Sequence, residues 1–213
     1  MKVALFGPTG RMGLTVARLA HAAGDAIVGA VAAADDPHMG RDLGELAGLG
    51  TLGVAVGADP ASGLLGAEVV IDFSTARAVA GLPALCARQK VALVSGTTNL
   101  DERTQAQLER AAESVPVLWA PNMSLGVQVL AELVTRAVQQ LGADYDVEIV
   151  ELHHRKKADS PSGTAKRLSQ AAQAGRGPMN ELHGRDGDVG ARTHDEIGVF
   201  GVRGGDVVGE HTV

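Results

Sequence analysis

The N-terminal strand, glycine turn and helix constrain the fold of this chain most. Lys2–Phe6 is a short apolar run typical of a buried strand, GPTGRMG follows, and an amphipathic run continues to Ala23. Glycines at this junction allow a tight turn, close approach of a pyrophosphate and close packing of helix on sheet. Helix-start amides then face the phosphates. The pattern predicts dinucleotide binding by Gly7, Pro8, Thr9, Gly10, Arg11 and Met12.

Strands and helices continue to alternate along the first half of the chain. Such alternation predicts an α/β fold with a doubly wound, Rossmann-like parallel sheet. We expect this dinucleotide domain to span residues 1–124. Its expected strands after the first are 26–31, 69–73, 91–94 and 115–119. Its expected later helices are 76–89 and 101–113. The glycine-rich loop 36–66 is expected to hold a short helix and a small strand, 54–56.

The pattern changes in the second half, which we expect to form an α+β domain over residues 125–213. A helix, 127–140, precedes a strand, 146–152. A second helix, 164–174, leads into a glycine-rich loop that ends near Arg192. Two strand-like runs, 196–202 and 206–213, flank Arg203-Gly204-Gly205 and predict a hairpin.

The end of the second strand leaves the cofactor preference open. Dinucleotide folds often place an acid there for the ribose 2′-hydroxyl, but the aligned position is Ala33. Asp35 or Asp36 could reach the ribose, or both could begin a turn with Pro37. The nearest basic residues in the sequence for a 2′-phosphate are Arg11 and Arg41. Both NADH and NADPH therefore remain candidates.

The stretch from Glu151 to Ala165, ELHHRKKADSPSGTA, concentrates reactive side chains in the second domain. His153 and His154 can carry protons near neutral pH. Residues 155–157 are three consecutive cations in a chain of net charge -6. Ser162 can cap a helix whose first amides are open to an anion. A proton donor beside such a helix suits reduction or protonation of a small carboxylate.

This stretch closely resembles the signature of the 4-hydroxy-tetrahydrodipicolinate reductase family, which serves lysine and diaminopimelate biosynthesis. The glycine turn also resembles the family's G-x-x-G-(R/K)-M-G, and the resemblance covers essentially all 213 residues. The signature is matched at Glu151, His153, His154, Lys157, Asp159, Ser160, Pro161, Ser162, Gly163, Thr164 and Ala165.

The resemblance implies reduction of 4-hydroxy-tetrahydrodipicolinate to tetrahydrodipicolinate with NADH or NADPH as the cofactor. It implies that His153 is the general acid and Lys157 a second proton donor or electrostatic partner. His154 would bind the substrate. Gly163 and Thr164 would hold a substrate carboxylate through backbone amides and a hydroxyl. Whether the ring loses water on the enzyme stays open.

The resemblance also implies that two strand ends border the nicotinamide. The first matches the family's G-T-T, and the second resembles its A-x-N-(F/M)-S segment. Phe73, in the I-D-F-S turn, either touches the cofactor or belongs to the core. The cofactor-binding residues implied here are Gly96, Thr97, Thr98, Ala120, Pro121, Asn122 and Met123.

Assembly and chain length can be compared with the family as well. In the family the second domain carries the substrate site and builds a homotetramer. Family members continue with a further strand and a helix that returns to the nucleotide domain. We therefore expect this sequence to lack a C-terminal return segment.

Composition argues against several other classes of function. Aromatic residues are only 2% and the net charge is -6, which disfavours a nucleic-acid binder. No signal segment or membrane-spanning apolar run is present, so we expect a cytoplasmic protein without a membrane partner. Cys86, the single cysteine, excludes an internal disulfide and reads as a small core residue. Basic side chains between Arg155 and Arg167 can attract a small dicarboxylate despite the net charge.

Two alternative functions would use only some of these sequence motifs. A metal-dependent hydrolase would use His153, His154, His183 or His194 with Asp159. Adjacent histidines on one strand point in opposite directions, so we expect no metal site. A non-catalytic dinucleotide sensor would need only the glycine turn, whereas the intact His-His-Lys-Ser-Gly-Thr set favours an enzyme.

Overall fold

The computed structural model describes all 213 residues, and they form two compact units, Met1–Pro121 and Asn122–Val213. The first holds a parallel sheet and the second a mixed sheet, which confirms the predicted fold class. The boundary that we expect between residues 124 and 125 stays a prediction. Limited proteolysis would test it.

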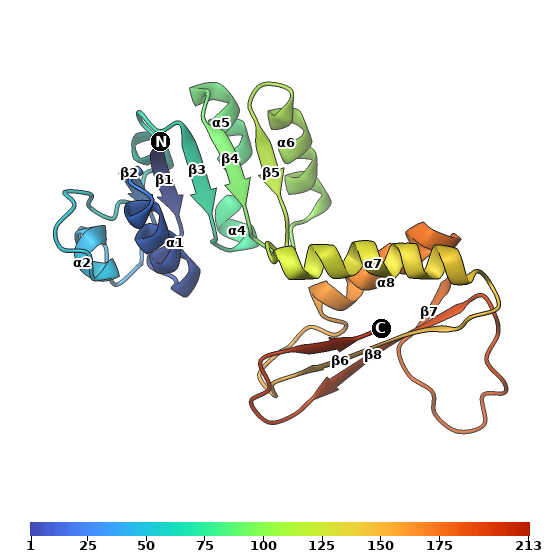
Figure 1. Ribbon diagram of the computed structural model, residues 1–213. Coiled ribbons are helices and arrows are strands. Elements are labelled where there is room, and N and C mark those ends of the chain that lie inside the picture. The colour runs from blue at the N-terminus through green and yellow to red at the C-terminus, as the bar shows by residue number, and fades with distance from the viewer. The chain divides into compact units, whose positions relative to one another are not determined.

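Unit 1 is built on a five-stranded parallel sheet with the order β2-β1-β3-β4-β5 (Figure 1). Strand order reverses between β1 and β3, and open α/β sheets bind ligands beyond the carboxyl ends at such a switch point. The strands are β1 (Lys2–Phe6), β2 (Ala26–Val31), β3 (Val69–Asp72), β4 (Ala92–Ser95) and β5 (Val117–Trp119).

Helices cover both faces of this sheet, as the alternation of buried residues along β1 requires. Val3 and Leu5 belong to a core shared with α1 and α2, whereas Ala4 and Phe6 belong to one shared with α5 and α6. Cys86 lies in the second core, as predicted. The helices are α1 (Arg11–Ala22), α2 (Leu43–Ala47), α3 (Pro60–Gly63), α4 (Ala76–Val79), α5 (Leu82–Gln89) and α6 (Glu102–Ala112).

Two local predictions for unit 1 are wrong. The helix expected over 76–89 is broken into α4 and α5, because Gly81 adopts a left-handed conformation (φ 88°) and Pro83 lies at the start of α5. The strand expected over 54–56 makes only one isolated bridge, between Ala55 and Asp42. There the carboxylate of Asp42 accepts the amide of Val54, so a side chain takes the place of a strand partner.

Unit 2 packs two helices on one face of a four-stranded sheet with the order β7-β8-β6-β9. Its core joins Val134 and Leu168 from the helices to Ile149 and Ile197 from the strands. The elements are α7 (Leu125–Leu141), β6 (Val147–His153), α8 (Gly163–Arg176), β7 (Asn180–Leu182), β8 (Glu196–Arg203) and β9 (Glu210–Thr212).

The hairpin predicted at the end of the chain does not form. Strand β6 lies between its two expected partners, parallel to β8 and antiparallel to β9. The segment 204–209 therefore crosses from one side of β6 to the other instead of making a tight turn. Strand β7 was also missed, since three largely exposed residues carry no alternating pattern.

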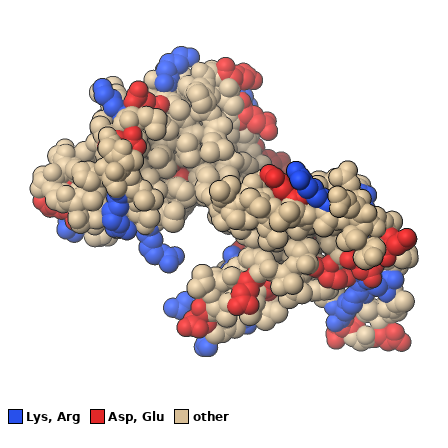
Figure 2. All heavy atoms as spheres, viewed as in Figure 1, with Lys and Arg blue, Asp and Glu red and all other residues tan.

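Surface charge is mixed on both units. On the faces that Figure 2 shows, Lys and Arg side chains lie among Asp and Glu side chains. None of the helices combines the length and the hydropathy that a membrane span needs.

Candidate active site

The glycine turn after β1 can bring a phosphate group close to the backbone. Gly7 has φ +77°, and a Cβ there would lie 2.8 Å from the carbonyl oxygen of Phe73. A Cβ on Gly13 would lie 2.2 Å from the Gly7 oxygen, so α1 packs directly on the turn. Gly10 precedes α1 and makes no side-chain cap. The first amides of α1 therefore stay available to an anion.

A cavity of about 740 Å³ lies at the carboxyl ends of β1, β2 and β3. This volume is in the range of small-molecule and cofactor sites. Arg77, which we did not predict, contributes to its lining, whereas Pro8, Arg11 and Met12 do not. Residues that line it include Gly7, Thr9, Gly10, Ala33, Asp35, Asp36, Phe73, Ser74 and Arg77.

Asp36 gives this cavity a fixed negative charge at the end of β2. The Thr9 hydroxyl donates to its carboxylate at 2.6 Å, and the amide of His38 donates at 2.8 Å. The Thr9 hydrogen bond is the main reason that the pKa of Asp36 lies below its usual value. Asp36 thus begins the turn and also faces the cavity.

Asp72, at the end of β3, holds the neighbouring strand ends together. Its carboxylate is fully buried. It accepts the hydroxyls of Ser74 at 2.5 Å, Ser95 at 2.6 Å and Thr97 at 2.8 Å. The Trp119 indole donates to the Thr97 carbonyl at 2.9 Å and adds β5. We missed this role, although an acid within an apolar strand is a visible signal.

The two segments predicted beside the nicotinamide begin at the ends of β4 and β5. A Cβ on Gly96 would lie 2.1 Å from the Phe73 ring, so that ring packs on the backbone of Gly96 and also lines the cavity. The amide of Ala120 donates to the Ser95 carbonyl at 3.1 Å. Thr98 is exposed. Pro121 is the last residue of unit 1, while Asn122 and Met123 belong to unit 2.

In unit 2, a fully buried carboxylate sits beside the predicted acid. Glu151 is 0% exposed and accepts a bidentate pair from Arg203 at 2.7 and 2.8 Å. Nδ1 of His153 lies 2.5 Å from Glu151, and the Ser162 amide donates to the same carboxylate at 3.1 Å. Burial raises the pKa of Glu151, but these three partners outweigh it and the net shift is downward. Glu151 is therefore an ionised acceptor at neutral pH.

His211, which we did not predict, links His153 to the start of α8. Its ring meets the His153 ring edge to face, with centroids 5.1 Å apart. Nε2 of His211 lies 2.9 Å from Oγ of Ser162, and that oxygen caps α8 by accepting the amide of Ala165. Burial, followed by the nearby His153, lowers the pKa of His211. His211 is thus neutral at physiological pH.

The predicted carboxylate-binding residues form the first turn of α8. Nothing lies within 4 Å of a Cβ built on Gly163, so space beside its backbone is open. The Thr164 hydroxyl accepts from the Asn122 amide group at 2.9 Å, which leaves its own hydrogen free to donate. The exposed Met123 makes no such link.

The remaining predicted residues differ in their surroundings. Nζ of Lys157 is held by both oxygens of Asp159, at 2.8 and 2.9 Å, so this cation is already paired. Nδ1 of His154 is buried and has no hydrogen-bond partner in this structure. No three His, Cys, Asp or Glu side chains gather into a metal-binding group. Metal content of the purified protein is the test of the hydrolase alternative.

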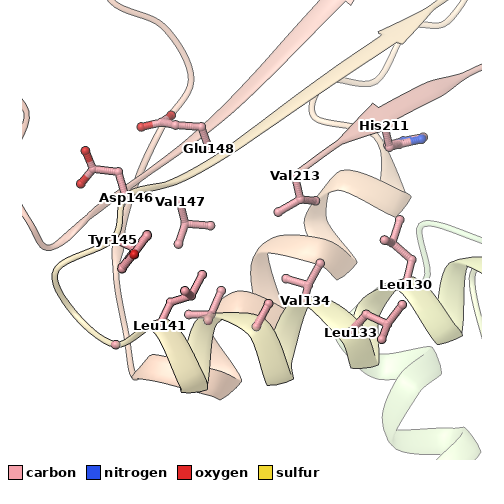
Figure 3. Close-up of a pocket in the computed structure, with 13 residues that line it drawn as sticks. Leu130, Leu133, Val134, Leu141, Tyr145, Asp146, Val147, Glu148, His211 and Val213 are labelled. Atoms are coloured by element: carbon pink, nitrogen blue, oxygen red, sulfur yellow. The ribbon is translucent and has the colours of Figure 1, made fainter.

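Unit 2 has a cavity of its own, with a volume of about 340 Å³ and a mostly apolar lining (Figure 3). Leu133, Val134 and Leu141 of α7 line one side, with Val147 and Val213 among the residues opposite. Asp146, Glu148 and His211 also line this cavity, but both carboxylates bind Arg192 and the imidazole binds Ser162, so no carboxylate–imidazole pair forms there. We therefore place the candidate active site at His153.

Comparison with known proteins gives consistent matches over the whole chain. Residues 1–123 match the model described as "Dihydrodipicolinate reductase, N-terminus", and residues 126–213 match "Dihydrodipicolinate reductase, C-terminus". A 4-hydroxy-tetrahydrodipicolinate reductase from Anaeromyxobacter dehalogenans is 50% identical over 216 residues, covering 100% of this chain and 80% of the relative. One from Methylocella silvestris is 42% identical over 217 residues with the same coverage.

A solved structure shares the fold. The "Dipicolinate bound Dihydrodipicolinate reductase from Paenisporosarcina sp. TG-14" superposes with a TM-score of 0.69 at 24% identity, and the match covers 99% of this chain and 81% of that chain. Both family models and the close relatives confirm the resemblance that we stated from the sequence motifs. The chain belongs to the dihydrodipicolinate reductase family.

Proposed function

We propose that this protein is an oxidoreductase that reduces 4-hydroxy-tetrahydrodipicolinate to tetrahydrodipicolinate and water, with NADH or NADPH as the cofactor. The observation that carries the proposal is the imidazole of His153, held by a buried carboxylate near the open start of α8. This arrangement joins a proton donor to a site for an anion. The reaction belongs to lysine and diaminopimelate biosynthesis.

The residues of unit 1 fit a dinucleotide. The backbone of Gly7–Gly10 and the first amides of α1 would hold the pyrophosphate, with Arg11 and Met12 beside it. The segments Gly96–Thr98 and Ala120–Met123 would border the nicotinamide, in positions that Asp72 helps to fix. The cofactor supplies a hydride when bound.

The residues of unit 2 would bind the dicarboxylate. Amides of Gly163 and Thr164 and the Thr164 hydroxyl would donate to one carboxylate. His154 would also bind the substrate. Lys157, oriented by Asp159, would supply positive charge or a second proton. His153 would donate the proton that balances addition of one hydride and loss of one water.

We further propose that unit 2 builds a homotetramer through the sheet face opposite α7 and α8. Val150 and Val202 lie on that face and are 44% and 49% exposed, although both are apolar strand residues. Burying them against other copies would stabilise the assembly. Light scattering should give four chains per particle, and Val202→Asp should lower that number. We place the protein in the cytoplasm, which cell fractionation would test.

The decisive experiment is a rate assay with freshly generated 4-hydroxy-tetrahydrodipicolinate, following oxidation of NADH and NADPH separately. Substrate-dependent oxidation supports the proposal, and the ratio of the two rates gives the cofactor preference that Ala33 leaves open. Binding of either cofactor without turnover would favour the sensor instead. Assays without substrate are the control.

A further inference from the structure

The ionised carboxylate of Glu151 has four polar contacts, more than Glu148 makes on the same strand. It receives two hydrogen bonds from Arg203, one from the Ser162 amide and one contact from His153. Three of these contacts come from Arg203 and Ser162, and the fourth comes from the proposed acid itself. Glu148 on the same strand also binds an arginine, Arg192, at 2.7 Å, but it touches no histidine.

We infer that Glu151 is the positioning residue for His153 and that Arg203 is its countercharge. This inference rests on the proposed function. An ionised carboxylate can only accept, so Nδ1 of His153 must carry a hydrogen. The nitrogen that gains and loses the catalytic proton is therefore Nε2.

The backbone near Nε2 agrees with this assignment. A Cβ on Gly209 would lie 2.8 Å from Nε2 of His153. Any other residue at 209 would cover the nitrogen that has to reach the substrate. Glycine leaves it open on that side.

Arg203 limits how strongly Glu151 acts on His153. A lone carboxylate beside an imidazole raises its pKa and holds the proton too tightly. The bidentate Arg203 offsets that charge. The ring of His211, whose pKa burial lowers, also packs against His153. Loss of Glu151 would leave Nδ1 of His153 without its acceptor, and loss of Arg203 would leave the buried carboxylate without its countercharge.

The experiment is a titration of the full chain with ¹⁵N-labelled histidine, followed by NMR. The chain has seven histidines, and the His153→Gln spectrum assigns the signal. In the unmodified protein, neutral His153 should carry its hydrogen on Nδ1. A hydrogen on Nε2 instead would overturn the inference, whether or not any variant folds.

Variants then test the positioning role. Glu151→Gln should let the hydrogen of neutral His153 populate both ring nitrogens, because a side-chain amide can donate as well as accept. Glu148→Gln, the matched control on β6, should leave that hydrogen on Nδ1. If Glu151→Gln folds and the hydrogen stays on Nδ1 alone, the inference is wrong.

Steady-state kinetics give the functional readout. Glu151→Gln should lower kcat with little change in KM, because the proton donor is no longer held in one orientation, and Glu148→Gln should change neither. An unchanged kcat in folded Glu151→Gln would contradict the positioning role. If the unmodified protein shows no turnover, the proposed function fails, while the NMR result still decides the geometry.

Discussion

His153 is the side chain on which the contacts of unit 2 converge. Glu151 holds one ring nitrogen, His211 packs against the ring, and Gly209 leaves the other nitrogen open. The ring is thus fixed by two strands and a loop before any ligand arrives. A preorganised acid needs no rearrangement when the charge of the reaction develops.

Removing the proton donor should abolish most turnover without weakening cofactor binding. We predict that His153→Gln lowers kcat by about 100-fold or more, the range for loss of a general acid. Lys157→Ala should also lower kcat strongly. Neither residue belongs to unit 1, so dinucleotide affinity, measured by fluorescence titration, should stay within about twofold. Full activity in either variant would remove that residue from the mechanism.

A single methyl group at position 209 tests access to Nε2. Gly209→Ala should lower kcat by about tenfold or more, because misplacement near the reacting atoms is costly. Gly205→Ala is the matched control, since Gly205 also has a positive φ, +55°, and no atom lies within 4 Å of a Cβ there. Steady-state kinetics of both variants would decide. Equal rates for the two would show that Nε2 is approached from another direction.

At the scale of elements, the strand ends of unit 1 depend on one carboxylate. Asp72→Ala should lower the free energy of unfolding by about 3 kcal/mol, since hydroxyls of Ser95 and Thr97 would lose a charged partner in a buried place. Asp101→Ala, which removes the N-cap of α6, should cost only about 1 kcal/mol. Urea denaturation measures both.

Cofactor binding should separate these two variants further. Asp72→Ala should also weaken dinucleotide binding, because it releases the Gly96–Thr98 segment, whereas Asp101→Ala should not. Equal affinities would mean that this segment is held by its backbone alone.

Much of the fold was readable from the sequence because its signals are local. Strand–turn–helix alternation predicted the parallel sheet, and the 151–165 stretch predicted the Ser162 helix cap, which the structure confirms. The role of His153 as the acid stays a prediction. Breaks caused by single residues, such as Gly81 in the helix expected over 76–89, were missed because the apolar pattern continues across them.

Partners that come from distant strands were not readable. Arg203 and His211 meet Glu151 and His153 only because β8 and β9 pair with the two edges of β6. We expected β8 and β9 to pair with each other, which would have placed His211 beside β8. A strand pattern shows which face is buried, but it does not name the neighbouring strand.

At the scale of the whole molecule, stability should fall in acid. Burial favours neutral Glu151, yet Arg203, His153 and the Ser162 amide give it a net lowered pKa. A group whose pKa is lower in the folded state stabilises the fold above its unfolded pKa and loses this effect as pH falls through the folded value. Lowered carboxyl pKa values occur in both units, for example at Asp36, Asp42 and Asp195.

We therefore predict that the urea midpoint changes little from neutral pH down to about pH 5 and drops steeply below about pH 4. Glu151→Gln should flatten this drop in the transition of unit 2. A midpoint that is as high at about pH 3 as at neutral pH would contradict the prediction.

The central place of β6 also sets the order of events during synthesis. Glu151 and His153 leave the ribosome together, but Arg203 pairs with the carboxylate across 52 positions. At about 5–20 residues per second, several seconds pass before that partner is made. During this delay the carboxylate of Glu151 has no arginine partner to offset its charge if it is buried. The candidate active site is therefore among the last parts of unit 2 to be completed, because it needs β8 to pair with β6.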